Sequence, residues 1–164
     1  MKGDISITLQ KGSHKKRDDL VTFLSDVCSV SSRLNLQEDD NLPGAKSPLS
    51  FTLSSDGIDS GIAFSGIPAG HEFNTFVLAI LQLGGSDLKL DESIKSVISS
   101  IDDKLIFEVF ISLDCHICPE VVQALNKFAI LNNNINCEND RRWTISRSGR
   151  KKRYSRSANH IFKW

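Results

Sequence analysis

The segment LIFEVFISLDCHICPEVVQALNKFAIL, residues 105–131, decides the fold that we expect for this chain. Residues 105–111 are mostly β-branched, aromatic and other apolar side chains, which predicts a strand. Two thiols, Cys115 and Cys118, follow within a short turn, and apolar side chains then recur at helical spacing from Val121 onward. The segment therefore predicts a strand, a turn with two cysteines and a helix, an order that is typical of a dithiol redox centre.

The two cysteines are expected to have different roles. A thiol at a helix start has its pKa lowered to roughly 3.5–7.5, from about 8.5, because the helix dipole and outward-pointing amides stabilise the thiolate. Cys115 is the expected attacking nucleophile, and Cys118, about one helical turn away, is the expected resolving thiol. We expect His116 and Pro119 to tune the pair, since a protonated His116 would place a positive charge beside the thiolate. A solvated spacer is an equally good interpretation of His116.

A structural zinc site is one alternative for these cysteines, but it needs two more ligands, and the other histidines and cysteines are scattered along the chain. A permanent disulfide is a second alternative, and it needs an oxidising compartment. No leader sequence precedes Asp4 and no apolar run approaches the length of a membrane span, so we expect a cytoplasmic protein with a reversible pair and no membrane association. Cys28 and Cys137 are expected to be small core residues.

The first half of the chain is expected to form an α/β unit. Its runs of apolar side chains predict strands at 5–9, 34–36, 49–53 and 61–66, and helices at 18–28 and 71–83. The resulting order, β-α-β-β-β-α, is that of a thioredoxin-like unit, but the turn at 10–14 carries no thiol. Pro48 precedes the third strand, where such folds often have a cis peptide bond.

The pattern of strand, turn and helix starts again at residue 105, after a short helix expected at 91–99. This internal repeat predicts an α/β chain with two tandem thioredoxin-like folds, the second incomplete. We expect a thioredoxin-like fold without a dithiol at 3–88, the start of a second fold carrying CxxC at 89–138, and a basic, disordered tail at 139–164.

The formal net charge of the chain is zero, but its charges are unevenly distributed. From Asn139 onward Asp140 is the only acid among many arginines and lysines. The basic run at 147–154 would suit a nucleic-acid backbone. Because basic runs of this size are more often solvated or accidental, nucleic-acid binding is the less favoured alternative.

Three motifs resemble the N-terminal domain of the F subunit of alkyl hydroperoxide reductase: PAGHEF at 68–73, the glycine pair at 84–85, and CHICPEVVQALN at 115–126. The resemblance extends from about residue 3 to residue 138. It implies a thiol–disulfide exchange module that takes electrons from a flavin reductase domain and passes them to the disulfide of a peroxiredoxin. FAD and NADH belong to that reductase domain, which is absent here, so no cofactor is expected in this chain. A catalytically inactive fragment that only docks with a peroxiredoxin is the alternative.

The resemblance also implies a role for Glu72, the acid of the GHEF motif. In that family the acid lies beside the dithiol and helps to deprotonate a thiol, so Glu72 is the expected general base. From the sequence alone, Glu72 is equally consistent with an ordinary first-turn acid that favours its own helix dipole.

The resemblance ends abruptly after Glu138. The family continues with a Met-Ile-Asp-Gly-Gly segment, an acidic helix and a Val-Pro-Thr strand, whereas this chain continues with basic residues. Residues 139–164 can be back-translated into codons that, when read in a frame shifted by one base, encode a segment close to that of the family. We therefore infer a frameshift at the codons of Glu138 and Asn139. The second fold would then be unfinished, and the strand at 105–111 would expose apolar surface and unpaired backbone.

Overall fold

The computed structural model describes residues 3–110 and 118–140, so all but the first two positions of the expected tail lie outside the described residues. The elements are β1 (Ile5–Gln10), α1 (Arg17–Ser29), β2 (Leu34–Asp39), β3 (Ser50–Ser55), β4 (Ile58–Ser65), α2 (His71–Leu83), α3 (Glu92–Ser99), β5 (Leu105–Phe110), α4 (Cys118–Leu131) and β6 (Ile135–Asp140). None of the helices found in these ranges combines the length and the apolar character that crossing a membrane requires.

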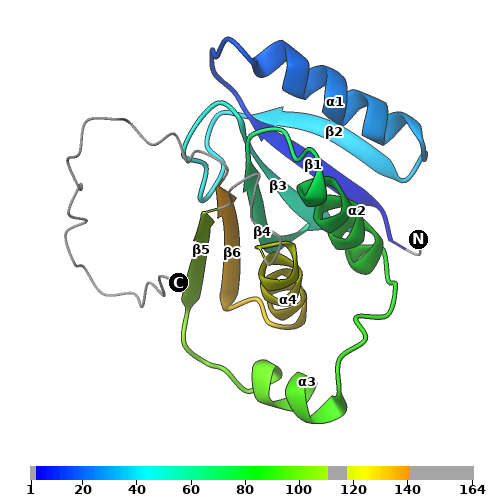
Figure 1. Ribbon diagram of the computed structural model, residues 1–164, viewed down its shortest axis with the longest axis vertical. Helices are drawn as coiled ribbons and strands as arrows, with labels where there is room; N and C mark the ends of the chain where they lie inside the picture. The colour runs from blue at the N-terminus through cyan, green and yellow to red at the C-terminus, as the bar shows by residue number, and fades with distance from the viewer. Residues whose placement is uncertain (1–2, 111–117, 141–164) are drawn as a thin grey trace, which may run out of the picture.

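The described strands form one six-stranded sheet in the order β2-β1-β3-β4-β6-β5 (Figure 1). β1 pairs with β2 in parallel and with β3 in antiparallel orientation, and β3 forms an antiparallel hairpin with β4. β6 lies between β4 and β5 and is parallel to both. The first four strands and the last two therefore belong to one continuous sheet.

The predicted hairpin of β3 and β4 is confirmed, and its turn has a local chemical cause. Asp56 and Gly57 form the two-residue loop, with positive φ values of 50° and 80°. An Asp-Gly loop of this kind matches the right-handed twist of the strands that it joins, because glycine adopts positive φ without strain.

Helices cover one face of the sheet. α1 packs on β2, α2 packs on β3, and α4 packs on both β4 and β6 and lies against α2 (Figure 1). Ring contacts between Phe23 of α1 and both Phe73 and Phe76 of α2 join the first two helices. Alternate strand residues point to the covered face and form the core: Ile5, Ile7, Leu9, Phe51, Leu53, Ile62, Phe64, Ile135 and Cys137. Each large apolar side chain buried in this way contributes about 1.5–3 kcal/mol.

The structure contains the same β-α-β arrangement twice. β1, α1 and β2 correspond to β5, α4 and β6, and both strand pairs are parallel. The first backbone bonds are also equivalent, since Ile5 N–H donates to Arg33 O and Leu105 N–H donates to Asn134 O, both at 2.8 Å. The expected α/β architecture with an internal repeat is confirmed.

Several local expectations can be compared directly with the structure. α2 spans His71–Leu83, as expected, whereas β5 ends at Phe110 and the last residue of the predicted strand, Ile111, lies outside the described residues. The expectation of a cis peptide at Pro48 is wrong, because the described residues contain no cis bond. An X-Pro bond favours the trans form by about 0.5–1 kcal/mol unless its tertiary surroundings select the other isomer.

β6 continues through Asn139 and Asp140, two residues that were expected to belong to the tail. Both are buried, with 3% of their surface exposed. Asn139 Nδ2 donates to Ala63 O at 3.2 Å and to Asn126 Oδ1 at 3.3 Å, which makes a buried polar network between β6, β4 and α4. Asn139 and Asp140 therefore belong to the packed end of β6 and not to a solvated tail.

Candidate dithiol site

The start of α4 carries the part of the predicted dithiol that the structure describes. Cys118 is the first residue of α4 and Pro119 the second, and both are half-buried. Proline suits the first turn because the N–H groups there have no partner within the helix. The predicted residues Cys115 and His116 lie outside the described residues.

Glu72, the expected base, lies in the first turn of α2 and is buried, with 8% of its surface exposed. β4 and β5 run in the same direction because both are parallel to β6, so α2 and α4, which follow them, begin at the same edge of the sheet. About one turn further along these helices, Gln123 Nε2 donates to Thr75 Oγ1 at 3.5 Å. The fold thus brings the first turn of α2, with Glu72, to the end of the sheet at which Cys118 begins α4.

The other two cysteines carry free thiols. Cys137 is part of the core and Cys28 packs against it, so their expected structural role is confirmed. Burial raises the pKa of the Cys28 thiol, and it raises the pKa of Cys137 to about 12 although Cys137 Sγ also contacts Asn139 Oδ1 at 3.5 Å. A thiol with a raised pKa is protonated at neutral pH and is a poor nucleophile.

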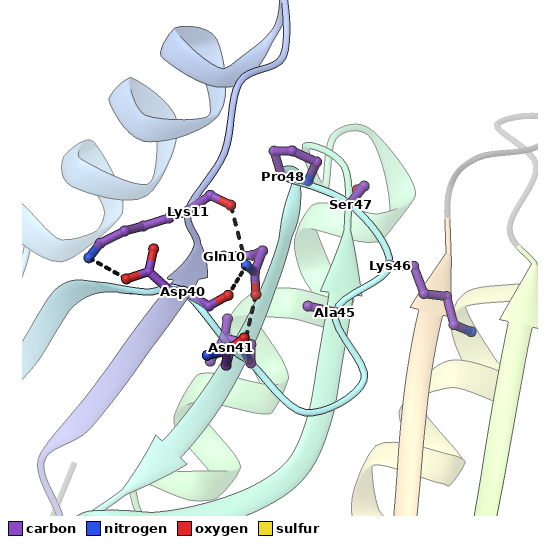
Figure 2. A pocket seen from close by; sticks show the side chains of 9 residues that line it. Gln10, Lys11, Asp40, Asn41, Ala45, Lys46, Ser47 and Pro48 are labelled. Carbon is purple, nitrogen blue, oxygen red and sulfur yellow. Dashed lines mark hydrogen bonds and ion pairs between the residues drawn. The ribbon is translucent and has the colours of Figure 1, made fainter.

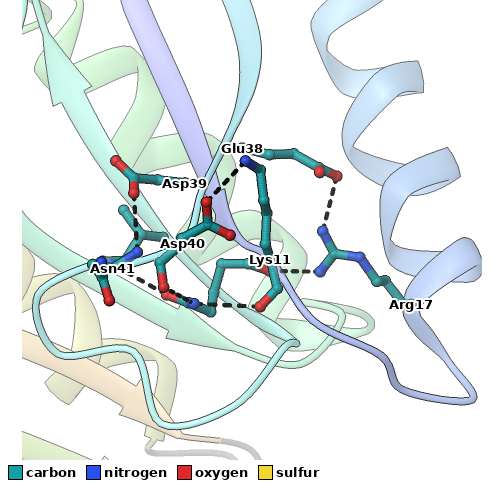
Figure 3. A network of polar contacts seen from close by, with 8 residues as sticks. Lys11, Arg17, Glu38, Asp39, Asp40 and Asn41 are labelled. Atoms are coloured by element: carbon teal, nitrogen blue, oxygen red, sulfur yellow. Dashed lines mark hydrogen bonds and ion pairs between the residues drawn. The ribbon is translucent and has the colours of Figure 1, made fainter.

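Arg17 occupies in α1 the place that Cys118 occupies in α4, the first residue of the helix. Its Nη1 donates to Gln10 O at 2.6 Å and to Pro48 O at 2.8 Å. Its Nη2 forms an ion pair with Glu38 Oε1 at 2.8 Å (Figure 3). The guanidinium therefore ties together the end of β1, the end of β2 and the segment before β3. At the place where the second unit has a thiol, the first unit has a structural cation.

A cavity of about 340 Å³ lies at the carboxyl ends of β1 and β2 (Figure 2), and Gln10 and Pro48, which Arg17 contacts, are part of its lining. Its lining combines the end of β1 with the segment between β2 and β3: Gln10, Lys11, Asp40, Asn41, Leu42, Ala45, Lys46, Ser47 and Pro48. Gln10 Nε2 donates to Asp40 O at 2.6 Å, and Lys11 Nζ pairs with Asp40 Oδ2 at 3.1 Å. The polar groups of the lining thus hold the segment against β1.

Lys46 links this segment to the second β-α-β unit, and Figure 2 shows its side chain pointing toward β6. Glu108 and Glu138 are direct neighbours on β5 and β6, where like charges would repel each other. Lys46 Nζ contacts the carboxylates of both, at 2.5 Å for Glu138 Oε2. Gly44 lets the segment approach, because a Cβ there would lie 2.8 Å from Glu138 Oε1. We call Lys46, Glu108 and Glu138 the carboxylate clamp.

The electrostatics of the carboxylate clamp favour the charged lysine. Burial lowers the pKa of Lys46, but the hydrogen bonds and charges of Glu108 and Glu138 outweigh burial and raise the pKa above its ordinary value of 10.5. Lys46 therefore stays protonated at neutral pH and neutralises one of the two neighbouring carboxylates.

Neither Arg17 nor Lys46 was predicted from the sequence. Arg17 precedes Asp18 and Asp19 at a helix start and has the appearance of a surface charge. A weak signal for the carboxylate clamp did exist, since Glu108 interrupts an otherwise apolar predicted strand and therefore points away from the core.

No protein-family model matches the chain. The F subunit of alkyl hydroperoxide reductase from Staphylococcus aureus (strain Mu50) is 41% identical to it over 135 residues, which are 82% of this chain and 26% of that protein. The chain therefore spans about a quarter of the length of the curated relatives that it matches.

Two solved structures from Enterococcus faecalis (V583) share the fold of this chain. The N-terminal domain of alkylhydroperoxide reductase AhpF matches with a TM-score of 0.77 at 29% identity, and the C503A mutant of AhpF matches with a TM-score of 0.76 at 31% identity. Each match covers 85% of this chain and 72% of the other chain.

We expect Lys46→Met to lower the free energy of unfolding by about 1 to 3 kcal/mol, because it leaves two adjacent carboxylates uncompensated. The pKa of Lys46 is raised on folding, so its contribution is complete below pH 10.5 and is lost as the pH rises through the higher folded value. The difference between wild type and variant, measured by urea unfolding, should therefore narrow in strongly alkaline buffer.

Lys95→Met is the matched control, because Lys95 forms an exposed pair with Glu92 within α3, and exposed pairs contribute little. Equal losses of stability in the two variants would contradict the role of the carboxylate clamp.

Proposed function

Because this chain belongs to the family of alkyl hydroperoxide reductase F subunits, as a counterpart of their N-terminal domain, we propose that it is a thiol–disulfide exchange module. The observation that carries the proposal is the position of Cys118. It is the first residue of α4, it belongs to a CxxC motif, and α4 follows β5, the strand at the end of the described sheet. Amides at a helix start stabilise a thiolate, and the corresponding residue of the first unit, Arg17, has no redox chemistry.

The proposed reaction is a two-electron exchange in two steps. The thiolate of Cys115 attacks one sulfur of a partner disulfide, forms a mixed disulfide and releases the other partner sulfur as a thiolate, which takes up a proton. Cys118 then loses its proton and attacks the sulfur of Cys115, which forms the Cys115–Cys118 disulfide and releases the second partner thiol. The partner is reduced and the module is oxidised, so the module needs a dithiol reductant to act again.

Glu72 is the proposed base for a thiol of this pair. Its position supports the role, because Glu72 is buried in the first turn of α2, and α2 begins at the same edge of the sheet as α4. A carboxylate held away from bulk water is a better acceptor for a thiol proton than one exposed to solvent. His116 and Pro119 are proposed to tune the same pair, by charge and by fixing the first turn of α4.

The proposed acceptor is the disulfide of a peroxiredoxin, and the proposed donor is a reductase domain that carries FAD and uses NADH. The names of the relatives support this assignment, since they are components of alkyl hydroperoxide reductases. This chain corresponds to about a quarter of such a relative, and the flavin and NADH chemistry is assigned to the remainder. A cytoplasmic location, in which a dithiol can be reduced repeatedly, is part of the same proposal.

We expect the reduced wild-type chain to reduce a small aromatic disulfide reagent, and Cys115→Ser to abolish this activity. Cys118→Ser should stop at the mixed disulfide, visible by mass spectrometry, because no thiol remains to resolve it. Cys28→Ser is the control and should keep full activity, since Cys28 is half-buried and its pKa is raised. Equal rates for wild type and Cys115→Ser would contradict the proposed chemistry, and an inactive chain that still binds a peroxiredoxin would favour the docking-only alternative.

We expect Glu72→Gln to slow the alkylation of Cys115 at neutral pH by about a hundredfold, because a general base of this kind speeds proton removal. The rates of wild type and variant should converge in alkaline buffer, where the thiol ionises without help. Glu120→Gln is the matched control, an exposed acid in the first turn of α4. If the two substitutions slowed alkylation equally, the effect of Glu72 would be that of any nearby negative charge, and its proposed role as a base would be contradicted.

A further inference from the structure

The outer edge of β5 presents backbone groups without a partner among the described residues. β5 is the last strand of the sheet, and its first residue, Leu105, directs its N–H toward Asn134 of the neighbouring loop. Because backbone groups alternate along a strand, the N–H and C=O groups of Ile106 and Glu108 point the other way, to the outside of the sheet. Such an edge is a template for another strand.

The internal repeat indicates the orientation that a strand on this edge would have. β1 is the counterpart of β5, and its corresponding edge pairs with β3 in antiparallel register, with Ser6 opposite Ser54 and Thr8 opposite Thr52. The outward residues of β1, Ser6 and Thr8, are the counterparts of Ile106 and Glu108. An antiparallel strand therefore fits the edge of β5 as β3 fits that of β1.

The charges at this edge indicate which side chains a strand that binds there should carry. The carboxylate clamp holds one lysine against two glutamates, so it has a formal surplus of one negative charge close to the edge. Lys104, directly before β5, is exposed. Because side chains two and four positions apart share one face of a strand, Lys104 and Glu108 lie on the same face.

We propose that the edge of β5 binds the β5 edge of a second copy of this chain, in antiparallel orientation with the two-fold axis at Ile106. In this register Lys104 of each copy lies opposite Glu108 of the other and supplies the positive charge that the carboxylate clamp lacks. An axis at Glu108 would instead place two carboxylates opposite each other, and an axis at Phe107 would place Lys104 opposite Phe110. A two-fold arrangement also satisfies both unpaired edges in one closed dimer.

Sedimentation equilibrium of the full 164-residue chain tests the proposal, together with backbone hydrogen exchange. We expect a monomer–dimer equilibrium, with the amides of Ile106 and Glu108 becoming protected as the protein concentration rises. Lys104→Glu should raise the dissociation constant about tenfold or more, because two attractive pairs become repulsive. Lys15→Glu is the matched control, with the same change of charge at an exposed lysine before α1, and it should leave the dissociation constant unchanged.

Ile106→Pro separates edge pairing from folding. The substitution removes an N–H that points outward and leaves the bonds between β5 and β6 in place, so the circular dichroism spectrum should be unchanged while the dimer is lost. A chain that stays monomeric, protection of these amides that does not depend on concentration, or a dimer that survives both Lys104→Glu and Ile106→Pro would overturn the proposal. Pairing only with a different added protein would overturn it as well.

Discussion

The parallel pairing of β4 with β6 is the interaction on which the rest of the structure depends. It runs from Ile62 opposite Cys137 to Ser65 opposite Asp140, and it joins the second β-α-β unit to the first. Two parallel strands and a helix bury too little surface to be stable alone. β5, α4 and β6 therefore need the edge of β4, and α4 strengthens this junction because it packs on β4 and β6 together.

Because of this junction, both units contribute to the candidate dithiol site. α2 belongs to the first unit and α4 to the second, yet both begin at one edge of the sheet because β4, β5 and β6 run in the same direction. The helices hold the two units together on one face of the sheet. On the other face, Lys46 reaches from the segment before β3 to Glu108 and Glu138. The candidate base and the candidate thiols thus depend on contacts between units.

Sequence patterns predicted the elements whose causes are local. The helix at 71–83 was predicted with its correct bounds, because an apolar run lies between Gly70 and Gly84, and the β3–β4 hairpin has its turn signal in Asp56 and Gly57. The contacts that tie the units together are long-range. Lys46 meets Glu108 across 62 positions, and no local pattern contains such a pair. The cis expectation at Pro48 failed for a related reason, since the isomer depends on tertiary surroundings.

The two β-α-β units show how one scaffold gives an inert site in one place and a candidate reactive site in another. The first residue of each helix lies at the carboxyl edge of the sheet, where backbone carbonyls and helix amides are exposed. Arg17 uses its donors at this point to bind Gln10 O and Pro48 O, so its side chain is fully engaged in closing the turn. A cysteine has one weak donor and cannot close the turn in this way. At the start of α4, packing between the helices takes the place of such an anchor, through contacts such as that of Gln123 with Thr75 of α2.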